Sequence, residues 1–330
     1  MCKINVNYLN SNGIITNSKA ITKFYIYEYE NLKGKMNYMY EGDSIFREID
    51  SNLVSIYDIF LENIFSNLDE YYGEINNDPI ILLIGGLDSD INIGKKELEK
   101  FLQENEGNLK IYKKLYLSDC QFLISTLQDL VLQSNSNFIQ FYKELCKNEI
   151  DLYDKCEYGY CISEQSRKIL TKAKDLFVSL YSCFDLLTKI CYELEHLKKC
   201  DINYPKLASF DKLYNPKLIK KIDFSGTIFE KSKYVTLLQG IRNDLIHNCG
   251  FEFFFKLYYK KDGYHIKEKF VFFPDFDDNG IIDKIKNRNR FFSKEIKLNE
   301  ILPEFYFDII KRINETTDKI IKTYKCKICI

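Results

Sequence analysis

Hydrophobic and polar positions along this chain repeat with two different periods. Residues 2–42 alternate apolar and polar side chains over short runs such as 21–29, and this alternation is typical of half-buried strands. From 44 to 72 the apolar residues instead recur every three or four positions, which predicts an amphipathic helix. Further helices are expected over 95–106 and 118–148.

The helical period becomes more regular from Ser163 onward. Ser163 belongs to a residue type that commonly caps the start of a helix, and an apolar stripe then runs through 170–194. A second helix is expected to begin at Ser225 and Thr227 and to occupy 227–248. The asparagine and glycine that follow predict the end of this helix.

Residues 251–273 have the pattern of a β-hairpin. An aromatic-rich run precedes Asp262 and Gly263, a dipeptide typical of hairpin turns, and a second alternating run follows. Residues 275–297 are polar and are expected to form a loop. The pattern over 298–324 then predicts a last long helix.

Together these elements predict an α+β protein that is mainly helical. Residues 1–150 are expected to form a mixed α/β region, for which sensing, RNA recognition and assembly are candidate roles. Residues 151–330 are expected to form a helical domain into which the hairpin 251–273 is inserted. A chain of 330 residues with 45% hydrophobic side chains can bury a sizeable core.

The chain has no apolar run that approaches the roughly 20 residues of a membrane helix, and its start lacks the apolar segment of a signal peptide. We therefore expect a cytoplasmic protein that does not enter a membrane. Its 11 cysteines are expected to be free thiols in a reducing compartment. Cys326 and Cys329 lack the second pair that a zinc site needs, so no metal and no other cofactor is expected.

The formal net charge of −1 excludes bulk, non-specific adhesion to nucleic acid, so any RNA contact must come from a local patch. One candidate patch contains Lys284, Lys286, Arg288, Arg290 and Phe291. Its cations can bind phosphates, and its aromatic ring can stack on a base. A solvated loop is the alternative interpretation, because acidic residues flank this stretch.

The candidate catalytic residues are Arg242, Asn243 and His247, near the end of the expected helix. An arginine can hold a phosphate, and a histidine can transfer a proton near neutral pH. Asn243 and His247 are four residues apart and share a helix face, while the long side chain of Arg242 can reach back towards them. A histidine at a helix end is also a common structural device, so a packing role is the alternative.

The segment 163–325 resembles the HEPN superfamily (higher eukaryotes and prokaryotes nucleotide-binding). The stretch from Arg242 to His247 fits the R-x(4–6)-H motif of this superfamily in its RN form, and 177–197 is similar to the long helix that precedes the motif helix. The resemblance implies a helical bundle that dimerises. It also implies a metal-independent endoribonuclease, which in this superfamily is commonly a toxin or an antiviral effector.

The resemblance implies a role for each motif residue as well. Arg242 would hold the scissile phosphate, and His247 would be the acid–base group that promotes attack by the ribose 2′-hydroxyl. Asn243 would orient His247 or the phosphate. Asp185, on the preceding helix, is a candidate supporting residue. Some toxins of the superfamily carry a tyrosine two residues after the motif histidine, where a partner nucleotidyltransferase modifies it, whereas this chain has Cys249 there.

Three functions stay open at this point. The first is a ribonuclease in defence or toxicity, with RNA, a second copy of the chain, and an antitoxin or defence-system protein as partners. The second is a catalytically silent module that binds nucleotides or RNA. The third is a protein-interaction module, which predicts a buried and fully hydrogen-bonded His247.

Overall fold

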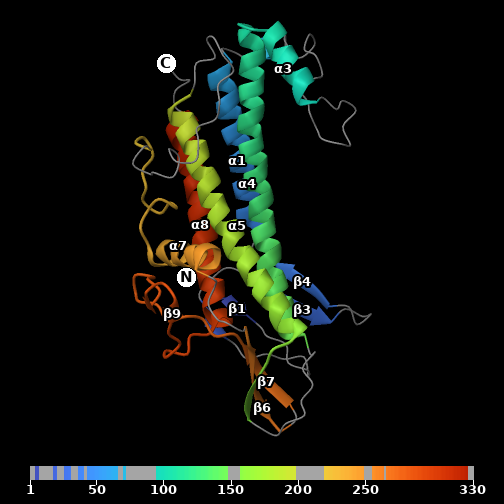
Figure 1. Cartoon of the computed structure of the whole chain (residues 1–330), viewed down its shortest axis with the longest axis vertical. Coiled ribbons are helices and arrows are strands. Elements are labelled where there is room, and N and C mark those ends of the chain that lie inside the picture. Colours follow the sequence, from blue (N-terminus) through green and yellow to red (C-terminus); the bar gives the residue numbers. More distant parts are fainter. Residues whose placement is uncertain are drawn as a thin grey trace. The chain divides into compact units, whose positions relative to one another are not determined.

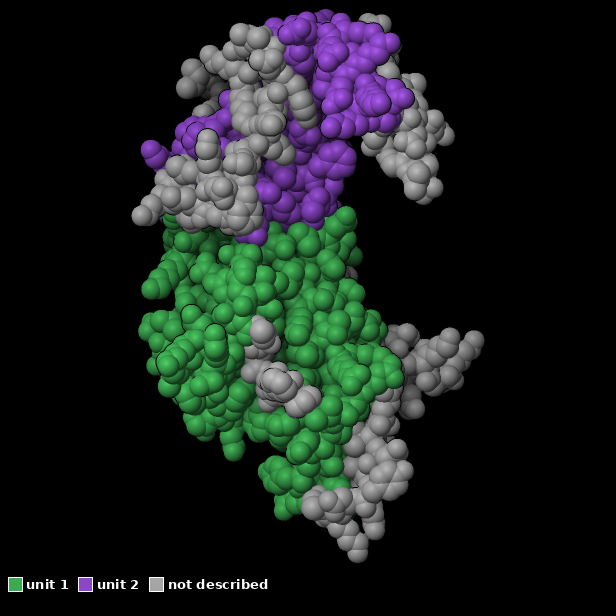
Figure 2. All heavy atoms as spheres, viewed as in Figure 1, with its two compact units in different colours: residues 1–49, 129–184, 224–316 green, residues 50–128, 185–223, 317–330 purple. Residues whose placement is uncertain are grey.

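The computed structural model describes residues 4–6, 18–20, 26–30, 36–40, 43–65, 70–71, 94–147, 157–197, 219–248, 255–263 and 265–325. The chain divides into two compact units (Figure 2), which we call unit 1 and unit 2. Unit 1 comprises 1–49, 129–184 and 224–316, and unit 2 comprises 50–128, 185–223 and 317–330. The expected boundary at residue 150, Cys249 and the pair Cys326 and Cys329 lie outside the described residues.

Helices make up most of the described chain, as expected (Figure 1). They are α1 (Asp43–Ile64), α3 (Lys95–Glu104), α4 (Leu109–Cys146), α5 (Glu164–Glu195), α7 (Lys233–His247) and α8 (Leu298–Tyr324). The expected helix at 118–148 begins nine residues earlier than predicted, because α4 is one continuous helix of 38 residues. No helix among these residues has an apolar stretch that is long enough to cross a membrane.

The strands form three small sheets. Backbone pairing joins β1 (Ile4–Val6), β2 (Ser18–Ala20), β3 (Ile26–Glu30) and β4 (Met36–Tyr40) in the order β2-β1-β3-β4. An antiparallel sheet contains β5 (Tyr158–Cys161), β6 (Leu257–Asp262) and β7 (His265–Phe270) in the order β5-β6-β7. The expected hairpin is confirmed as β6 and β7, whose pairing closes between Asp262 and His265.

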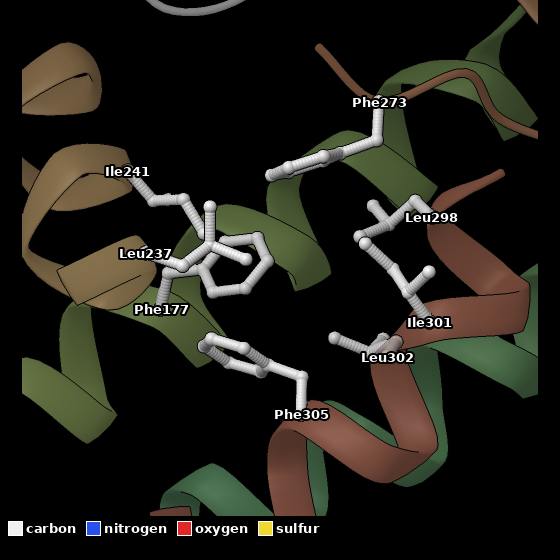
Figure 3. Close-up of a pocket in the computed structure, with 8 residues that line it drawn as sticks. All are labelled: Phe177, Leu237, Ile241, Phe273, Leu298, Ile301, Leu302 and Phe305. Atoms are coloured by element: carbon white, nitrogen blue, oxygen red, sulfur yellow. The ribbon is translucent and has the colours of Figure 1, made fainter. Parts of the chain in front are cut away.

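The core of unit 1 lies where α5, α7 and α8 meet. In Figure 1 α7 crosses the direction of the other two helices. Apolar side chains of all three helices converge here, together with Phe273 from the chain after β7 (Figure 3): Phe177, Leu237, Ile241, Phe273, Leu298, Ile301, Leu302 and Phe305. Their burial fixes which face of α7 is left for solvent.

The structure corrects the expected start of α7. The helix begins at Lys233, and Ser232 is its N-cap, with the hydroxyl accepting a hydrogen bond from the amide of Val235 at 3.3 Å. Thr227 lies in a turn instead, where its hydroxyl donates to the carbonyl of Phe224 at 2.6 Å. A serine or threonine can cap a helix only where the preceding backbone brings its side-chain oxygen to the first amides of the helix. Here the path of that backbone is set by contacts with residues far away in the sequence.

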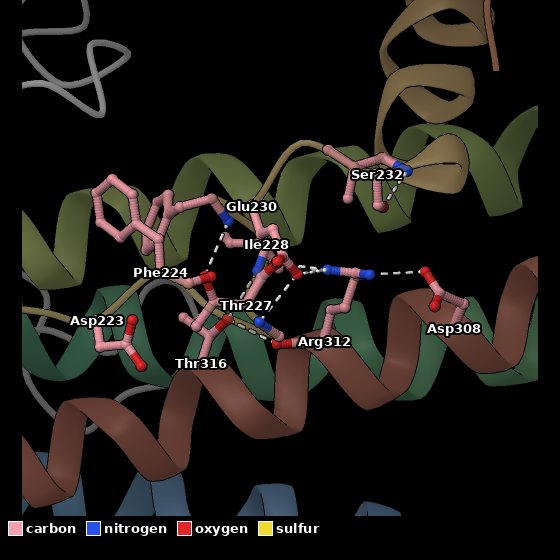
Figure 4. A network of polar contacts seen from close by, with 12 residues as sticks. Asp223, Phe224, Thr227, Ile228, Glu230, Ser232, Asp308, Arg312 and Thr316 are labelled. Atoms are coloured by element: carbon pink, nitrogen blue, oxygen red, sulfur yellow. Dashed lines mark hydrogen bonds and ion pairs between the residues drawn. The ribbon is translucent and has the colours of Figure 1, made fainter. Parts of the chain in front are cut away.

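Those contacts come from Arg312 on α8 (Figure 4). Its guanidinium donates to Asp308 at 2.8 Å, to Glu230 at 3.1 Å and to the carbonyl of Thr227 at 3.1 Å. One turn further along α8, the hydroxyl of Thr316 accepts from the amide of Ile228 at 3.1 Å. This network fastens the turn before α7 to α8 and so determines where α7 begins.

Residues 275–294, expected as a polar loop, are folded and contain β8 (Lys284–Ile285) and β9 (Asn289–Arg290). We call them the clamp segment. Its ends are joined by the buried Asp275, whose carboxylate accepts hydrogen bonds from the amide of Ser293 at 2.8 Å, its hydroxyl at 2.6 Å, and the amide of Lys294 at 3.0 Å. Burial alone would raise the pKa of Asp275, but these bonds to the charged form lower it.

The clamp segment lies along α7. Gly280 has φ +80°, and a Cβ placed there would lie 1.9 Å from the carbonyl oxygen of Lys233 and 3.0 Å from the amide nitrogen of Leu237. Ile282 is buried, and its side chain lies in contact range of Gly240 on α7. Most of the segment is loop, as expected, but its two short strands and its packing on α7 were not predicted. The packing uses single apolar and glycine contacts and leaves no continuous stripe in the sequence.

We predict that Gly280→Ala lowers the free energy of unfolding by more than about 2 kcal/mol. The left-handed backbone alone accounts for about 1 kcal/mol, and the clash with the backbone of α7 adds to it. Gly263→Ala is the matched control, because Gly263 has φ +59° but open space around its Cβ position. Urea unfolding that gives equal losses for the two variants would show that the close approach to α7 is unimportant.

Candidate active site

The last turn of α7 brings together the three residues of the expected site. Nη1 of Arg242 lies 3.1 Å from Nε2 of His247 and donates to Oδ1 of Asn243 at 3.2 Å. Arg242 is half-buried, whereas Asn243 and His247 are exposed. The arginine therefore reaches back along the helix as the spacing predicts, and the group faces solvent.

The contact between Arg242 and His247 is a hydrogen bond in one tautomer of the imidazole. A guanidinium can only donate hydrogen bonds, so the bond forms when Nε2 accepts and Nδ1 carries the proton. The last turn of α7 therefore brings a permanent positive charge next to a side chain that can transfer a proton.

Tyr181 of α5 supports the guanidinium from the other side. The Cζ of Arg242 lies 5.0 Å from the centroid of the Tyr181 ring, which is within the range of a cation–π interaction worth about 0.5–2 kcal/mol. This contact restricts the plane of the guanidinium while leaving its edge accessible. The role of Tyr181 could not be predicted from local sequence, because it depends on the packing of α5 against α7.

Asp244 points the opposite way and anchors the same turn. Its side chain is 0% exposed and accepts from Arg290 at 3.0 Å, from Lys284 at 3.1 Å and from Asn248 at 2.9 Å. Burial by itself would raise the pKa of Asp244, but these donors lower it. The local signal for this role is the four-residue spacing to Asn248, which suits a side-chain hydrogen bond on a helix.

The candidate RNA patch is split by these contacts. Arg290, 4% exposed, and Lys284 are engaged with Asp244. Lys286, Arg288 and Phe291 are exposed on the outer part of the clamp segment. The structure therefore gives the first two a role in holding α7, and leaves the other three as candidates for RNA contact.

Asp185 and Ile246 complete the residues of interest. Asp185 belongs to unit 2, so its expected support of the site stays a prediction. The side chain of Ile246 is 53% exposed, because Asp244 and Ile241 occupy the inward face of this turn.

We predict that Asp244→Asn lowers the free energy of unfolding at pH 7 by about 3 kcal/mol, because it leaves Arg290 buried without a charged partner. The pKa of Asp244 is lower in the folded protein, so its contribution is complete above the unfolded pKa of about 3.9 and is lost as the pH falls through the folded pKa. The difference between the two proteins should therefore shrink below about pH 4.

Urea unfolding at several pH values measures this effect, with Asp283→Asn as the control. Asp283 is half-exposed and lies 3.6 Å from Lys294, so its loss should change stability by less than about 0.5 kcal/mol. A similar small effect for Asp244→Asn, or a difference that grows in acid, would contradict the assignment.

Comparison with known proteins adds no relative to this site. No family model matches the chain, and no match was found among curated proteins or solved structures.

Proposed function

We propose that this protein is a metal-independent endoribonuclease of the HEPN type that cuts cytoplasmic RNA as a defence or toxin effector. The observation that carries the proposal is the 3.1 Å contact between Nη1 of Arg242 and Nε2 of His247 on an exposed helix end. It pairs a group that binds phosphate with a group that accepts a proton. These are the two needs of a 2′-hydroxyl attack on an RNA phosphodiester.

Arg242 would bind the scissile phosphate. Its Nη1 group contacts Asn243 and His247, while its Nε and Nη2 groups donate to no other described residue. Nε and Nη2 form one edge of the guanidinium fork, which matches two phosphate oxygens. A phosphate bound on this edge leaves the contact of Nη1 with Asn243 in place. Nε2 of His247 has one lone pair, so it must give up its contact with Nη1 when it accepts the proton of the 2′-hydroxyl.

His247 would take the proton of the ribose 2′-hydroxyl through Nε2. The 2′-oxygen then bonds to phosphorus, and the bond from phosphorus to the 5′-oxygen breaks. The leaving 5′-oxygen takes a proton from an acid, and the products are a 2′,3′-cyclic phosphate and a 5′-hydroxyl. Because one imidazole begins as the base, the acid must be a second group, for which a second His247 is the proposed source.

The exposure of His247 favours this function over a packing role. A protein-interaction module that used His247 only to pack predicts a buried, fully hydrogen-bonded ring, whereas this ring is exposed. Ile246, its neighbour, also leaves an apolar surface in solvent. An isologous contact through this end of α7 would cover Ile246 and bring two copies of the motif to one phosphate.

For the chemistry, we predict that His247→Ala lowers the rate of RNA cleavage by about 10²–10⁴ without changing the melting temperature. Wild-type activity should persist in EDTA and leave 2′,3′-cyclic phosphate ends. His196→Ala is the control, because His196 also ends a helix and is exposed. Cleavage that requires Mg²⁺ and survives in His247→Ala would refute this mechanism.

For the assembly, we predict a homodimer that Ile246→Asp converts to a monomer, because charge in a contact between apolar surfaces is not compensated. Leu132→Asp, at an exposed apolar position on α4, should leave the dimer intact. Light scattering and cleavage rates are measured on the same samples. A wild-type monomer with full activity would count against a shared site.

A further inference from the structure

The sheet of β5, β6 and β7 carries aromatic side chains along one face. Its register pairs Tyr160 with Tyr258 and Tyr258 with Phe270, and residues that pair across strands project from the same side. The rings of Tyr160 and Tyr258 have centroids 6.0 Å apart, and those of Tyr258 and Phe270 are 5.7 Å apart with an interplanar angle of 13°. The result is a continuous aromatic row across three strands.

The outer part of this face is open to solvent. Tyr158 and Tyr160 are 59% and 56% exposed, and they border a hollow of about 440 Å³ whose lining includes Tyr258, Phe270 and Phe272. Large rings left in water at neighbouring positions are a surface that a ligand can cover. Tyr158 and Tyr160 are two residues apart on one strand, so their rings start about 6.6 Å apart along it.

Lysines lie over these rings. Nζ of Lys260 is 5.0 Å from the centroid of Tyr158, and Nζ of Lys256 is 5.2 Å from that of Tyr160. Neither lysine forms an ion pair with a carboxylate in the described part of the chain. Lys260 also interacts with the hydroxyl of Tyr158 and, at longer range, with Glu157 and Glu268, and these interactions raise its pKa. Both ammonium groups thus lie at the aromatic surface without a carboxylate in direct contact.

The remaining charges of the face compensate one another in part. Lys297 lies over Phe270 at 4.7 Å and is paired with Glu268 and Glu300. Glu295 also lines the hollow and is exposed. Lys256 and Lys260 thus supply positive charge at the exposed tyrosines, while Glu268, opposite Lys260 in the register, and Glu295 make the face mixed in charge.

We propose that this face binds single-stranded nucleic acid, with bases stacked on Tyr158 and Tyr160 and backbone phosphates bound by Lys256 and Lys260. Aromatic platforms flanked by cations bind single strands because unpaired bases expose their π-faces, whereas a duplex hides them. Binding here does not depend on the proposed cleavage at His247. It would give an RNA substrate a second point of attachment on unit 1.

Two other occupants fit the surface less well. A second copy of the chain would offer only Glu268 and Glu295 of this face as partners for the lysines, which is less negative charge than a phosphate backbone supplies. A protein partner would need acidic groups placed at the same spacing as the rings. A nucleic acid strand supplies both the repeated negative charge and the flat apolar faces.

The first test measures fluorescence anisotropy of a labelled 2′-O-methyl RNA single strand, which cannot be cleaved by 2′-hydroxyl attack. The double variant Tyr158→Leu with Tyr160→Leu keeps apolar bulk but removes both rings, and it should weaken binding by at least about tenfold. Phe122→Leu, at an exposed ring on α4, should leave Kd unchanged. Thermal unfolding of all variants confirms that they are folded.

The second test uses Lys256→Gln with Lys260→Gln, surface changes that leave the tyrosines in place. Loss of two phosphate contacts should flatten the dependence of log Kd on log salt by about 1.4, and a duplex of the same sequence should bind more weakly than the single strand. Wild-type protein that binds this strand but does not cleave the same sequence with free 2′-hydroxyls would overturn the proposed function alone and leave the binding face standing.

Several results would overturn the proposal. They are no binding of the single strand by the wild type, unchanged Kd in both double variants, or equal affinity for duplex and single strand. A change in sedimentation of the tyrosine variant with unchanged Kd would instead assign the face to self-association.

Discussion

A buried carboxylate holds the candidate site in place. Asp244 lies inside unit 1, where an unpaired charge would be strongly unfavourable, and it is stabilised by donors from the clamp segment. Arg290 and Lys284 are 46 and 40 residues away in sequence, so the charge can be buried only when the clamp segment is folded against α7. The ordered end of α7 and the fold of the clamp segment therefore depend on each other.

The last turn of α7 has a buried side and an exposed side. Asp244 faces inward, while Asn243 and His247, on either side of it in the sequence, face solvent. Chemistry at an exposed helix end needs groups that water and substrate can reach, yet it also needs them within a few tenths of an ångström of a fixed geometry. Rigid support from beneath satisfies both conditions, and the ring of Tyr181 adds support from the side.

Much of the fold could be predicted from sequence because its signals are local. The apolar stripes of α5 and α8 and the turn between β6 and β7 are readable in short windows. The start of α7 could not be predicted from sequence, because Thr227 and Ser232 are comparable cap residues. The choice between them depends on the contacts of Arg312. The position of Arg242 and His247 was predictable from their spacing, whereas the support from Tyr181 was not.

The basic residues show why composition alone does not identify a binding surface. In sequence, the cations of the clamp segment form the denser cluster, but Arg290 and Lys284 already have a buried anionic partner. Lys256 and Lys260 are less conspicuous, yet they lie over exposed rings without a carboxylate partner in the described chain. A phosphate gains most from a cation whose charge is not already neutralised. The distribution of partners, more than the density of charge, therefore determines where a polyanion can bind.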